Sequence, residues 1–259
     1  MTPGKGSERI NSRLIVVYGG PKCRKTTSAS HLTGAKWIVS DANCIPTLTA
    51  LGRLPPDEDL YEVDGIAAGR QVTQEAIKIA EEHGSKALPP AFVYDSITQF
   101  QDWHEQDVAQ ATNQRFMGDN KKEGGWQQFN AEFGSFIDEI GVLSRYVTCV
   151  VIAHAKEKSD GSKGEWAGLN LKPQMALKLA RTANWVLYQS IRNFAAAESD
   201  QSDEFVNVWK DVNGNLRGTE VIINTQTVGF WTAAVNARHL EPEEPANLAA
   251  ILKKEGLWK

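Results

Sequence analysis

The segment that most constrains this chain is GGPKCRKTT, which runs from Gly19 to Thr27. It follows the mostly apolar, β-branched run 13–18, and such a run is typical of a buried parallel strand. A glycine followed at this spacing by Lys25 and Thr26 matches a phosphate loop, in which backbone N–H groups and a helix N-terminus cradle phosphates. The lysine neutralises the phosphates, and the threonine hydroxyl binds magnesium. The segment therefore predicts nucleotide binding, with a plain basic turn between a strand and a helix as the alternative.

Two positions depart from the usual form of this loop. Arg24 stands where the motif has its second glycine, and Lys22 stands where many such loops also carry glycine. Glycine lets the backbone fold tightly around a phosphate because it has no Cβ. An arginine is tolerated there if its φ is negative and its side chain points outward, and the two added cations favour phosphate binding. The residues expected to hold the nucleotide are Gly19, Gly20, Lys22, Cys23, Arg24, Lys25, Thr26 and Thr27.

Two strand ends further along the chain carry residues that fit the same site. Asp95 follows the apolar run 91–94, where a phosphate-loop enzyme needs an acidic residue to hold magnesium together with Thr26. The alternative for Asp95 is a turn or helix cap. His154 follows the strand expected at 146–153 and is placed to sense the γ-phosphate, unless it is a structural histidine.

The order of apolar runs and helical patterns predicts the fold class. Short buried runs alternate with helical spacing at 72–82 and 126–143, which indicates an α/β fold with a mostly parallel sheet flanked by helices. The last third is richer in strands and ends in a short helix with Pro245 near its first turn. We expect a flexible tail at 1–12 and one nucleotide-binding domain at 13–259. The expected strands are 13–18, 36–40, 91–94, 146–153, 185–187, 205–209 and 220–224.

Composition excludes several classes of protein. The net charge of −4 argues against a globally basic nucleic-acid binder, although a local basic surface remains open. The three cysteines have no C-x-x-C spacing, which argues against a disulfide framework and a zinc site. No apolar run approaches the roughly 18 residues of a membrane span. We therefore expect a soluble protein of the cytoplasm.

Two polar segments, 106–125 and 157–172, are long for loops in a compact domain, and such loops are often functional. Both mix cations with aromatic residues, which suits single-stranded DNA because phosphates meet the cations and bases stack on the rings. Ordinary solvated loops are the alternative, since acidic residues dilute the charge. The residues expected to contact DNA are Arg115, Phe116, Lys121, Lys122, Lys158, Lys163 and Trp166.

At this point a family resemblance becomes visible over residues 13–252. The sequence resembles phage-encoded RecA-like ATPases, namely the Sak-type single-strand-annealing recombinases and the related AAA-type phage NTPases. This resemblance implies ATP with Mg²⁺, a ring or filament of identical subunits on single-stranded DNA, and work beside a single-strand-binding protein in an infected bacterial cell. It also implies that Arg238 reaches a neighbouring subunit's nucleotide as an arginine finger. The residues that carry it are Gly19, Lys25-Thr26, Tyr94-Asp95-Ser96, Trp126-Gln127, Val151–His154, Asn236–Arg238 and Glu244–Leu248.

One departure from this family bears on catalysis. RecA-like proteins carry a glutamate just after the second strand to activate the attacking water, whereas this chain has Asp41 and Asn43 there. If Asn43 takes that role, it orients water without accepting its proton, and hydrolysis is slow. If Asp41 takes it, hydrolysis survives. The leading hypothesis is an ATP-binding recombination protein. The alternatives are a helicase loader or packaging-type ATPase, and a non-catalytic assembly protein with a degenerate phosphate loop.

Overall fold

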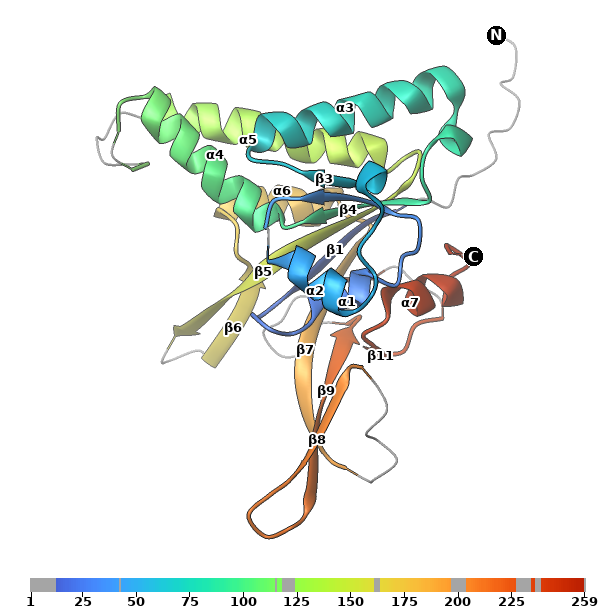
Figure 1. The fold of residues 1–259 in the computed structure, drawn as a ribbon. Helices are drawn as coiled ribbons and strands as arrows, with labels where there is room; N and C mark the ends of the chain where they lie inside the picture. The colour runs from blue at the N-terminus through green and yellow to red at the C-terminus, as the bar shows by residue number, and fades with distance from the viewer. Residues whose placement is uncertain are drawn as a thin grey trace.

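The computed structural model describes residues 13–41, 43–114, 116–117, 124–160, 164–196, 204–226, 234–235 and 239–258. Its core is a sheet in the order β11-β9-β7-β1-β5-β4-β2-β3, with helices on both faces (Figure 1). The strands are β1 (Leu14–Gly19), β2 (Lys36–Val39), β3 (Leu60–Glu62), β4 (Ala91–Asp95), β5 (Thr148–Asp160), β6 (Gly164–Leu169), β7 (Trp185–Ala195), β8 (Val206–Lys210), β9 (Leu216–Asn224), β10 (Ala234–Val235) and β11 (Glu243–Pro245).

Seven α-helices and two short 3-10 turns complete the described part of the chain. The helices are α1 (Lys25–Ala29), α2 (Cys44–Ala50), α3 (Ile66–His83), α4 (Ile97–Ala111), α5 (Gly124–Leu143), α6 (Pro173–Thr182) and α7 (Leu248–Lys254), and the turns are η1 (Asp57–Asp59) and η2 (Ser85–Ala87). Within the described residues, no helix combines the length and the apolar character that a membrane span needs.

The central strands run parallel, and the strands that follow β7 in the chain run antiparallel. β3, β2, β4, β5, β1 and β7 pair in parallel, while β9 pairs antiparallel with β7, β8 and β11. This arrangement confirms the expected α/β fold, with its mostly parallel sheet flanked by helices and its strand-rich C-terminal third. β5 lies between β1 and β4, so Gly19 is level with His154, and Asp95 is level with Ile152.

The sequence of β1 shows why the sheet needs helices on both faces. All six residues of LIVVYG are buried, as expected for a parallel strand covered on both sides. Leu14, Val16 and Tyr18 face a core formed with α3, α4, α5 and α6. Ile15 and Val17 face a second core formed with α1, α2 and α7. Adjacent side chains on a strand point to opposite faces, so one apolar run supplies both cores.

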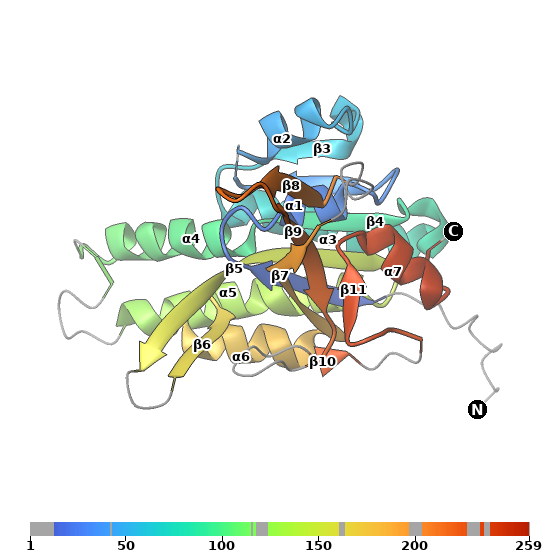
Figure 2. The same cartoon turned by 90° about the horizontal axis from the view of Figure 1, so that it is seen from below.

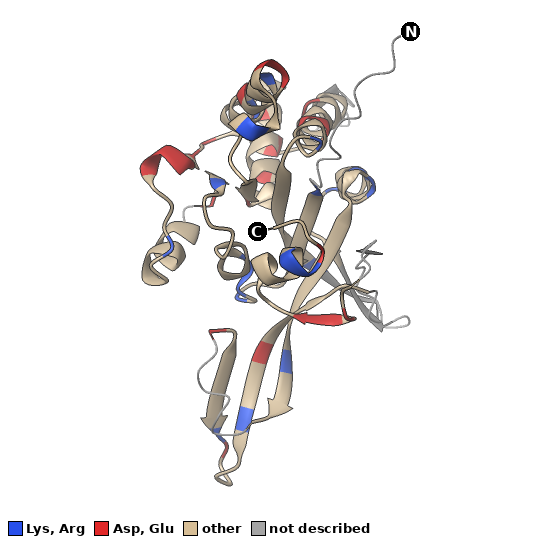
Figure 3. Ribbon diagram, turned by 90° about the vertical axis from the view of Figure 1, so that its right-hand side faces the viewer, with Lys and Arg blue, Asp and Glu red and all other residues tan. Residues whose placement is uncertain are grey.

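An antiparallel arm of β7, β8 and β9 projects from the body of the molecule (Figure 1, and Figure 2 from below). Figure 3 shows charges of both signs along it. Arg192 pairs with Glu220 and with Glu243, and Arg217 pairs with Asp211 at 3.1 Å. The arm is therefore not a uniformly basic surface.

Both segments expected as loops contain regular structure, which corrects that expectation. α4 continues through Ala111, so residues 106–111 are helical. β5 continues to Asp160 and pairs antiparallel with β6, so 157–169 is mostly a β-hairpin. Pro245 is also not in a helix: it ends β11, and α7 is capped by Asn247, whose Oδ1 accepts a hydrogen bond from Ala250 N at 3.0 Å.

Candidate functional site

The loop between β1 and α1 sits at the edge of the parallel sheet where β4 also ends and where β5 reaches His154. Gly19 leaves no space for a side chain there. A Cβ on Gly19 would lie 2.2 Å from the backbone oxygen of Gln189 on β7 and 2.7 Å from Cys23 Sγ. Such distances are well inside van der Waals contact, so the first glycine of the loop is sterically required.

Lys25 lies inside the loop and is 7% exposed. Its Nζ donates hydrogen bonds to the backbone oxygens of Gly19 at 3.0 Å and Gly20 at 2.9 Å, and lies 3.7 Å from Cys23 Sγ. These carbonyls offset the cost of burying the ammonium group. Burial raises the pKa of the Cys23 thiol, although Lys25 acts in the opposite direction. The thiol is therefore neutral at ordinary pH, and Lys25 remains the loop's buried charge.

Thr26 and Asp95 meet across the site. The Thr26 hydroxyl donates to Asp95 Oδ2 at 2.7 Å. Asp95 is 4% exposed, and burial raises its pKa to about 6, against the opposing effects of the Thr26 hydrogen bond and of Lys25. A hydroxyl and a carboxylate are the oxygen ligands that Mg²⁺ prefers. The pair therefore fits the Mg²⁺ expected with a nucleotide.

Ser40 and Ser96 hold together the ends of β2 and β4, next to the Thr26–Asp95 pair. Ser40 Oγ donates to the backbone oxygen of Ser96 at 2.8 Å and accepts from Ser96 N at 2.9 Å. The two bonds join the end of β2 to the end of β4, next to Asp95. Sequence reasoning missed Ser40; its signal was a small polar residue closing a buried strand.

The structure distinguishes the two residues that were candidates for the water-activating position, Asp41 and Asn43. Asp41 N donates to the backbone oxygen of Asp95 at 3.2 Å, and the charge of Asp41 acts on both Asp95 and His154. Asn43 is exposed, and its N and Nδ2 donate to Asp41 Oδ1 at 3.0 and 2.7 Å. The geometry therefore favours Asp41 as the group that faces the site, with Asn43 orienting its carboxylate.

His154 lies on β5 opposite Gly19. Its backbone N donates to Thr98 Oγ1 at 3.0 Å, and its backbone oxygen accepts from Asn170 N at 2.8 Å. Burial lowers the pKa of the imidazole, and Lys25 lowers it further. The imidazole is therefore neutral near pH 7 and offers a hydrogen bond without adding charge.

Arg24 was expected to fit the loop only with a negative φ, and the structure contradicts this condition. Lys22 shares the unexpected conformation. Both have positive φ, 57° and 64° respectively, in the left-handed region that favours glycine. Both side chains are exposed, as expected for Arg24. A residue with a Cβ pays roughly 1–2 kcal/mol in this conformation. The loop thus takes up a shape suited to glycine, at a cost in backbone strain.

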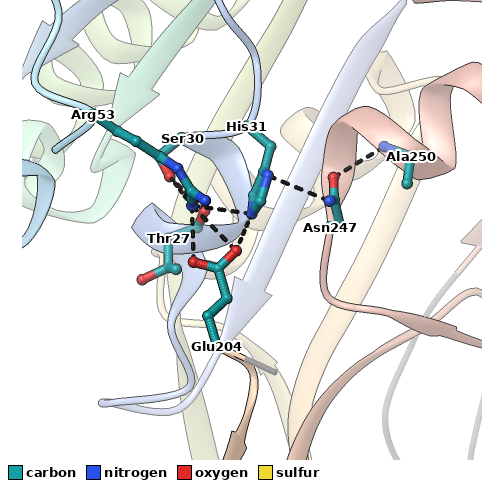
Figure 4. Close-up of polar contacts among 7 residues, drawn as sticks. All are labelled: Thr27, Ser30, His31, Arg53, Glu204, Asn247 and Ala250. Atoms are coloured by element: carbon teal, nitrogen blue, oxygen red, sulfur yellow. Dashed lines mark hydrogen bonds and ion pairs between the residues drawn. The ribbon is translucent and has the colours of Figure 1, made fainter. Parts of the chain in front are cut away.

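The helix that follows the loop is anchored on its far end by a polar cluster (Figure 4). Glu204, just before β8, lies 2.5 Å from His31 Nε2 and 2.9 Å from Arg53 Nη1. Asn247 Nδ2 lies 3.3 Å from His31 Nδ1. The cluster ties the end of α1 to the segment after α2, to the arm and to α7, so three distant parts of the chain fix the phosphate-loop helix.

The remaining candidate residues are not brought to this site by the described part of the chain. Phe116 is 58% exposed near the end of α4. In the β5–β6 hairpin, Lys158 and Trp166 occupy paired backbone positions. The candidates that fall outside the described residues are Arg115, Lys121, Lys122, Lys163 and Arg238.

A family model described as "AAA domain" matches residues 11–201, which span the loop, Asp95 and His154. The chain belongs to the AAA domain family. Together with the geometry of the loop, this membership makes the chain a P-loop NTPase-type protein. No curated protein matches the sequence.

Two solved structures are similar to this AAA domain chain. One is described as a prototypical ATPase from the type III secretion system of pathogenic bacteria, with 15% identity and a TM-score of 0.42 over 68% of this chain and 50% of that one. The chain thus spans half the length of that ATPase. The other is a KaiC-like protein from the archaeon Pyrococcus horikoshii, with 10% identity and a TM-score of 0.39 over 91% of this chain and 87% of that one.

Proposed function

We propose that this chain binds ATP with Mg²⁺, hydrolyses it, and acts as a recombination protein on single-stranded DNA. The hydrogen bond between Thr26 and Asp95 carries the nucleotide part of the proposal, because it brings a phosphate-loop hydroxyl to a strand-end carboxylate beside Lys25. A basic turn that only resembles a phosphate loop would not be expected to form a hydrogen bond between its threonine and a strand-end carboxylate.

Each residue of the site has a role in such a reaction. Lys25 exchanges the two loop carbonyls for phosphate oxygens. Thr26 and Asp95 would hold Mg²⁺, which would supply charge neutralisation for the transferred phosphoryl group. Asp41 accepts the proton of the attacking water, and the neutral His154 donates a hydrogen bond toward the γ-phosphate. Electrostatic positioning of this kind supplies most of the catalysis in phosphoryl transfer.

The DNA part is supported by contacts that link His154 to the two segments proposed to bind DNA. β5 runs without interruption from His154 into the β5–β6 hairpin. From α4, Gln101 Oε1 accepts from Lys172 N at 2.6 Å. The Lys172 ammonium lies 2.9 Å from Glu105 and 4.9 Å from the ring centroid of Trp126. These contacts connect β5 and α4 to Glu105 and Trp126, which flank segment 106–125, and we propose that a change at the γ-phosphate reaches DNA through them.

The proposal is tested by measuring ATP turnover with and without single-stranded DNA, using Asp95→Asn as the inactive control. We expect Mg²⁺-dependent turnover that rises with single-stranded DNA and is absent from the variant. ATP turnover that does not change when single-stranded DNA is added would contradict the recombination role. Translocation on duplex DNA would favour a helicase loader or packaging-type ATPase. Failure to bind nucleotide would leave the non-catalytic assembly protein.

We also propose that the protein works as a ring or filament beside a single-strand-binding protein, with Arg238 of one subunit acting at the nucleotide of the next. Light scattering with ATP and single-stranded DNA measures the assembly. A protein that stays monomeric under those conditions would remove Arg238 from the catalytic model, because an arginine finger supplied by a neighbour requires a neighbour.

A further inference from the structure

Gln189 is a polar side chain in the middle of the sheet. It follows the apolar run Trp185–Tyr188 on β7, is 0% exposed, and is level with Gly19 on β1. Its Nε2 donates a hydrogen bond of 2.5 Å to the backbone oxygen of Cys23. The central sheet is therefore joined directly to the middle of the phosphate loop by a side chain from a distant part of the sequence.

The other end of the same amide is unsatisfied. Gln189 Oε1 is buried and has no hydrogen-bond partner among the described residues. A buried acceptor without a partner destabilises the folded state, and an apolar side chain of the same length would avoid this cost. Another interaction of the same side chain must therefore offset the cost of the unsatisfied oxygen. The hydrogen bond from Gln189 Nε2 to the Cys23 carbonyl is that interaction.

The loop needs support from outside itself. Cys23 lies between Lys22 and Arg24, and both of these neighbours hold the left-handed conformation without being glycine. Within the loop, Cys23 Sγ donates to the backbone oxygen of Gly20 at 2.9 Å. Lys25 also bonds to loop carbonyls, but it must leave them to reach a phosphate. The bond from Gln189 does not depend on Lys25, so it persists when the lysine moves.

We propose that Gln189 is a positioning residue that holds the phosphate loop in its nucleotide-binding shape by tethering the Cys23 carbonyl to β7. It supplies from the sheet the restraint that lets Lys22 and Arg24 stay in conformations ordinarily given to glycine. This role rests on the proposed nucleotide-binding function of the loop.

The test replaces Gln189 with methionine, which has a similar length and neither end of the amide. Titration with a fluorescent ATP analogue and Mg²⁺ should show roughly tenfold weaker binding, the effect of losing one hydrogen bond that orders the site. The thermal midpoint should change little, because loss of the bond to the Cys23 carbonyl and removal of the unsatisfied Oε1 act in opposite directions. A purely structural residue would give the opposite pattern, a lower midpoint with unchanged affinity, and that result would overturn the proposal.

Asn224 on β9 is a matched control. It is also a buried amide, and its Nδ2 donates to the backbone oxygen of Tyr188 at 3.1 Å and to Ser190 Oγ at 3.0 Å, both on β7 and outside the loop. Asn224→Leu should lower the thermal midpoint and leave nucleotide affinity unchanged. An equal loss of affinity in this variant would mean that any damage near β7 weakens binding, which would contradict a specific tether.

Rescue provides the second readout. Glycine holds the left-handed conformation without a tether, so Arg24→Gly in the Gln189→Met background should recover most of the lost affinity. If Gln189→Met does not fold, Gln189→Asn replaces it, because the shorter amide cannot span the distance to Cys23. Wild-type affinity in Gln189→Asn, or no rescue by Arg24→Gly, would refute the tether.

The variant Lys25→Ala distinguishes failure of the Gln189 tether from failure of the proposed nucleotide binding. If Lys25→Ala abolishes binding and Gln189→Met binds as the wild type does, the tether is wrong and the nucleotide function stands. If Lys25→Ala binds normally, the nucleotide function itself fails.

Discussion

The hydroxyl of Thr26 donates a 2.7 Å hydrogen bond to the carboxylate of Asp95, which joins the start of α1 to the end of β4. These residues come from different strand–helix units, and β5 lies between their strands in the sheet. The contact therefore depends on the strand order as well as on the two motifs. The two oxygens that we propose as Mg²⁺ ligands lie side by side because of this contact.

Lys25→Ala should weaken ATP binding on the order of a hundredfold, because charge-assisted hydrogen bonds to phosphate are among the strongest in proteins. Fluorescent-nucleotide titration measures the affinity. Lys36→Ala is the matched control, since the Lys36 ammonium bonds to Tyr61 Oη at 3.0 Å at the start of β2. Unchanged affinity in Lys25→Ala would remove the phosphate-loop assignment.

Arg24→Gly should stabilise the protein by about 1 kcal/mol, because the residue holds φ 57° and glycine adopts that conformation without steric cost. Urea unfolding measures the free energy. ATP turnover should rise as well if the strained loop limits the geometry of the phosphates. Arg24→Ala keeps the Cβ and serves as the control. An equal gain in stability for alanine would show that the loss of the charged side chain, and not relief of strain, is responsible.

The contribution of Asp95 to the free energy of unfolding should fall as pH rises from about 4 to about 6 and then level off. Burial raises the pKa of this carboxyl from 3.8 to about 6, so the folded protein binds more protons than the unfolded chain between these values. Stability decreases with pH wherever the folded state binds more protons. Urea titrations without nucleotide or Mg²⁺ measure the effect, and Asp95→Asn should remove this component. A component that persists in the variant would assign it to another group.

Asp41→Asn should lower kcat for ATP hydrolysis by at least about a hundredfold and leave nucleotide affinity close to that of the wild type, because an amide cannot accept the proton of the attacking water. Asn43→Ala should have a smaller effect, since Asn43 only orients Asp41. Steady-state kinetics and nucleotide titration separate the two quantities. The reverse ranking of these variants would assign the catalytic position to Asn43.

Lys121→Ala with Lys122→Ala should weaken binding to single-stranded DNA and flatten its dependence on salt. Each lost phosphate contact should reduce the slope of log K against log salt by about 0.7. Fluorescence anisotropy over a range of salt concentrations measures this slope. Lys78→Ala with Lys86→Ala removes the same charge on α3 and η2 and should leave the slope unchanged. Equal slopes in both double variants would remove this segment from the DNA-binding model.

The buried strands could be located from sequence because strands covered on both faces need continuous apolar runs. β1, β4 and the start of β5 lie close to their predicted bounds. The segment after Gln106 could not be assigned in the same way. The exposed face of α4 is polar, so its last turn has no clear apolar pattern in the sequence. The β5–β6 hairpin lacks the apolar signal of a buried strand.

The sequence by itself determined the phosphate loop, the acidic strand end at Asp95 and the α/β class, because each of these follows from local residue chemistry. The tertiary structure decided which residues share the site. It placed Asp41 beside Asp95, gave Arg24 a positive φ, and brought the amide of Gln189 to Cys23. These relationships depend on strand order and packing between distant segments, and no local pattern encodes them.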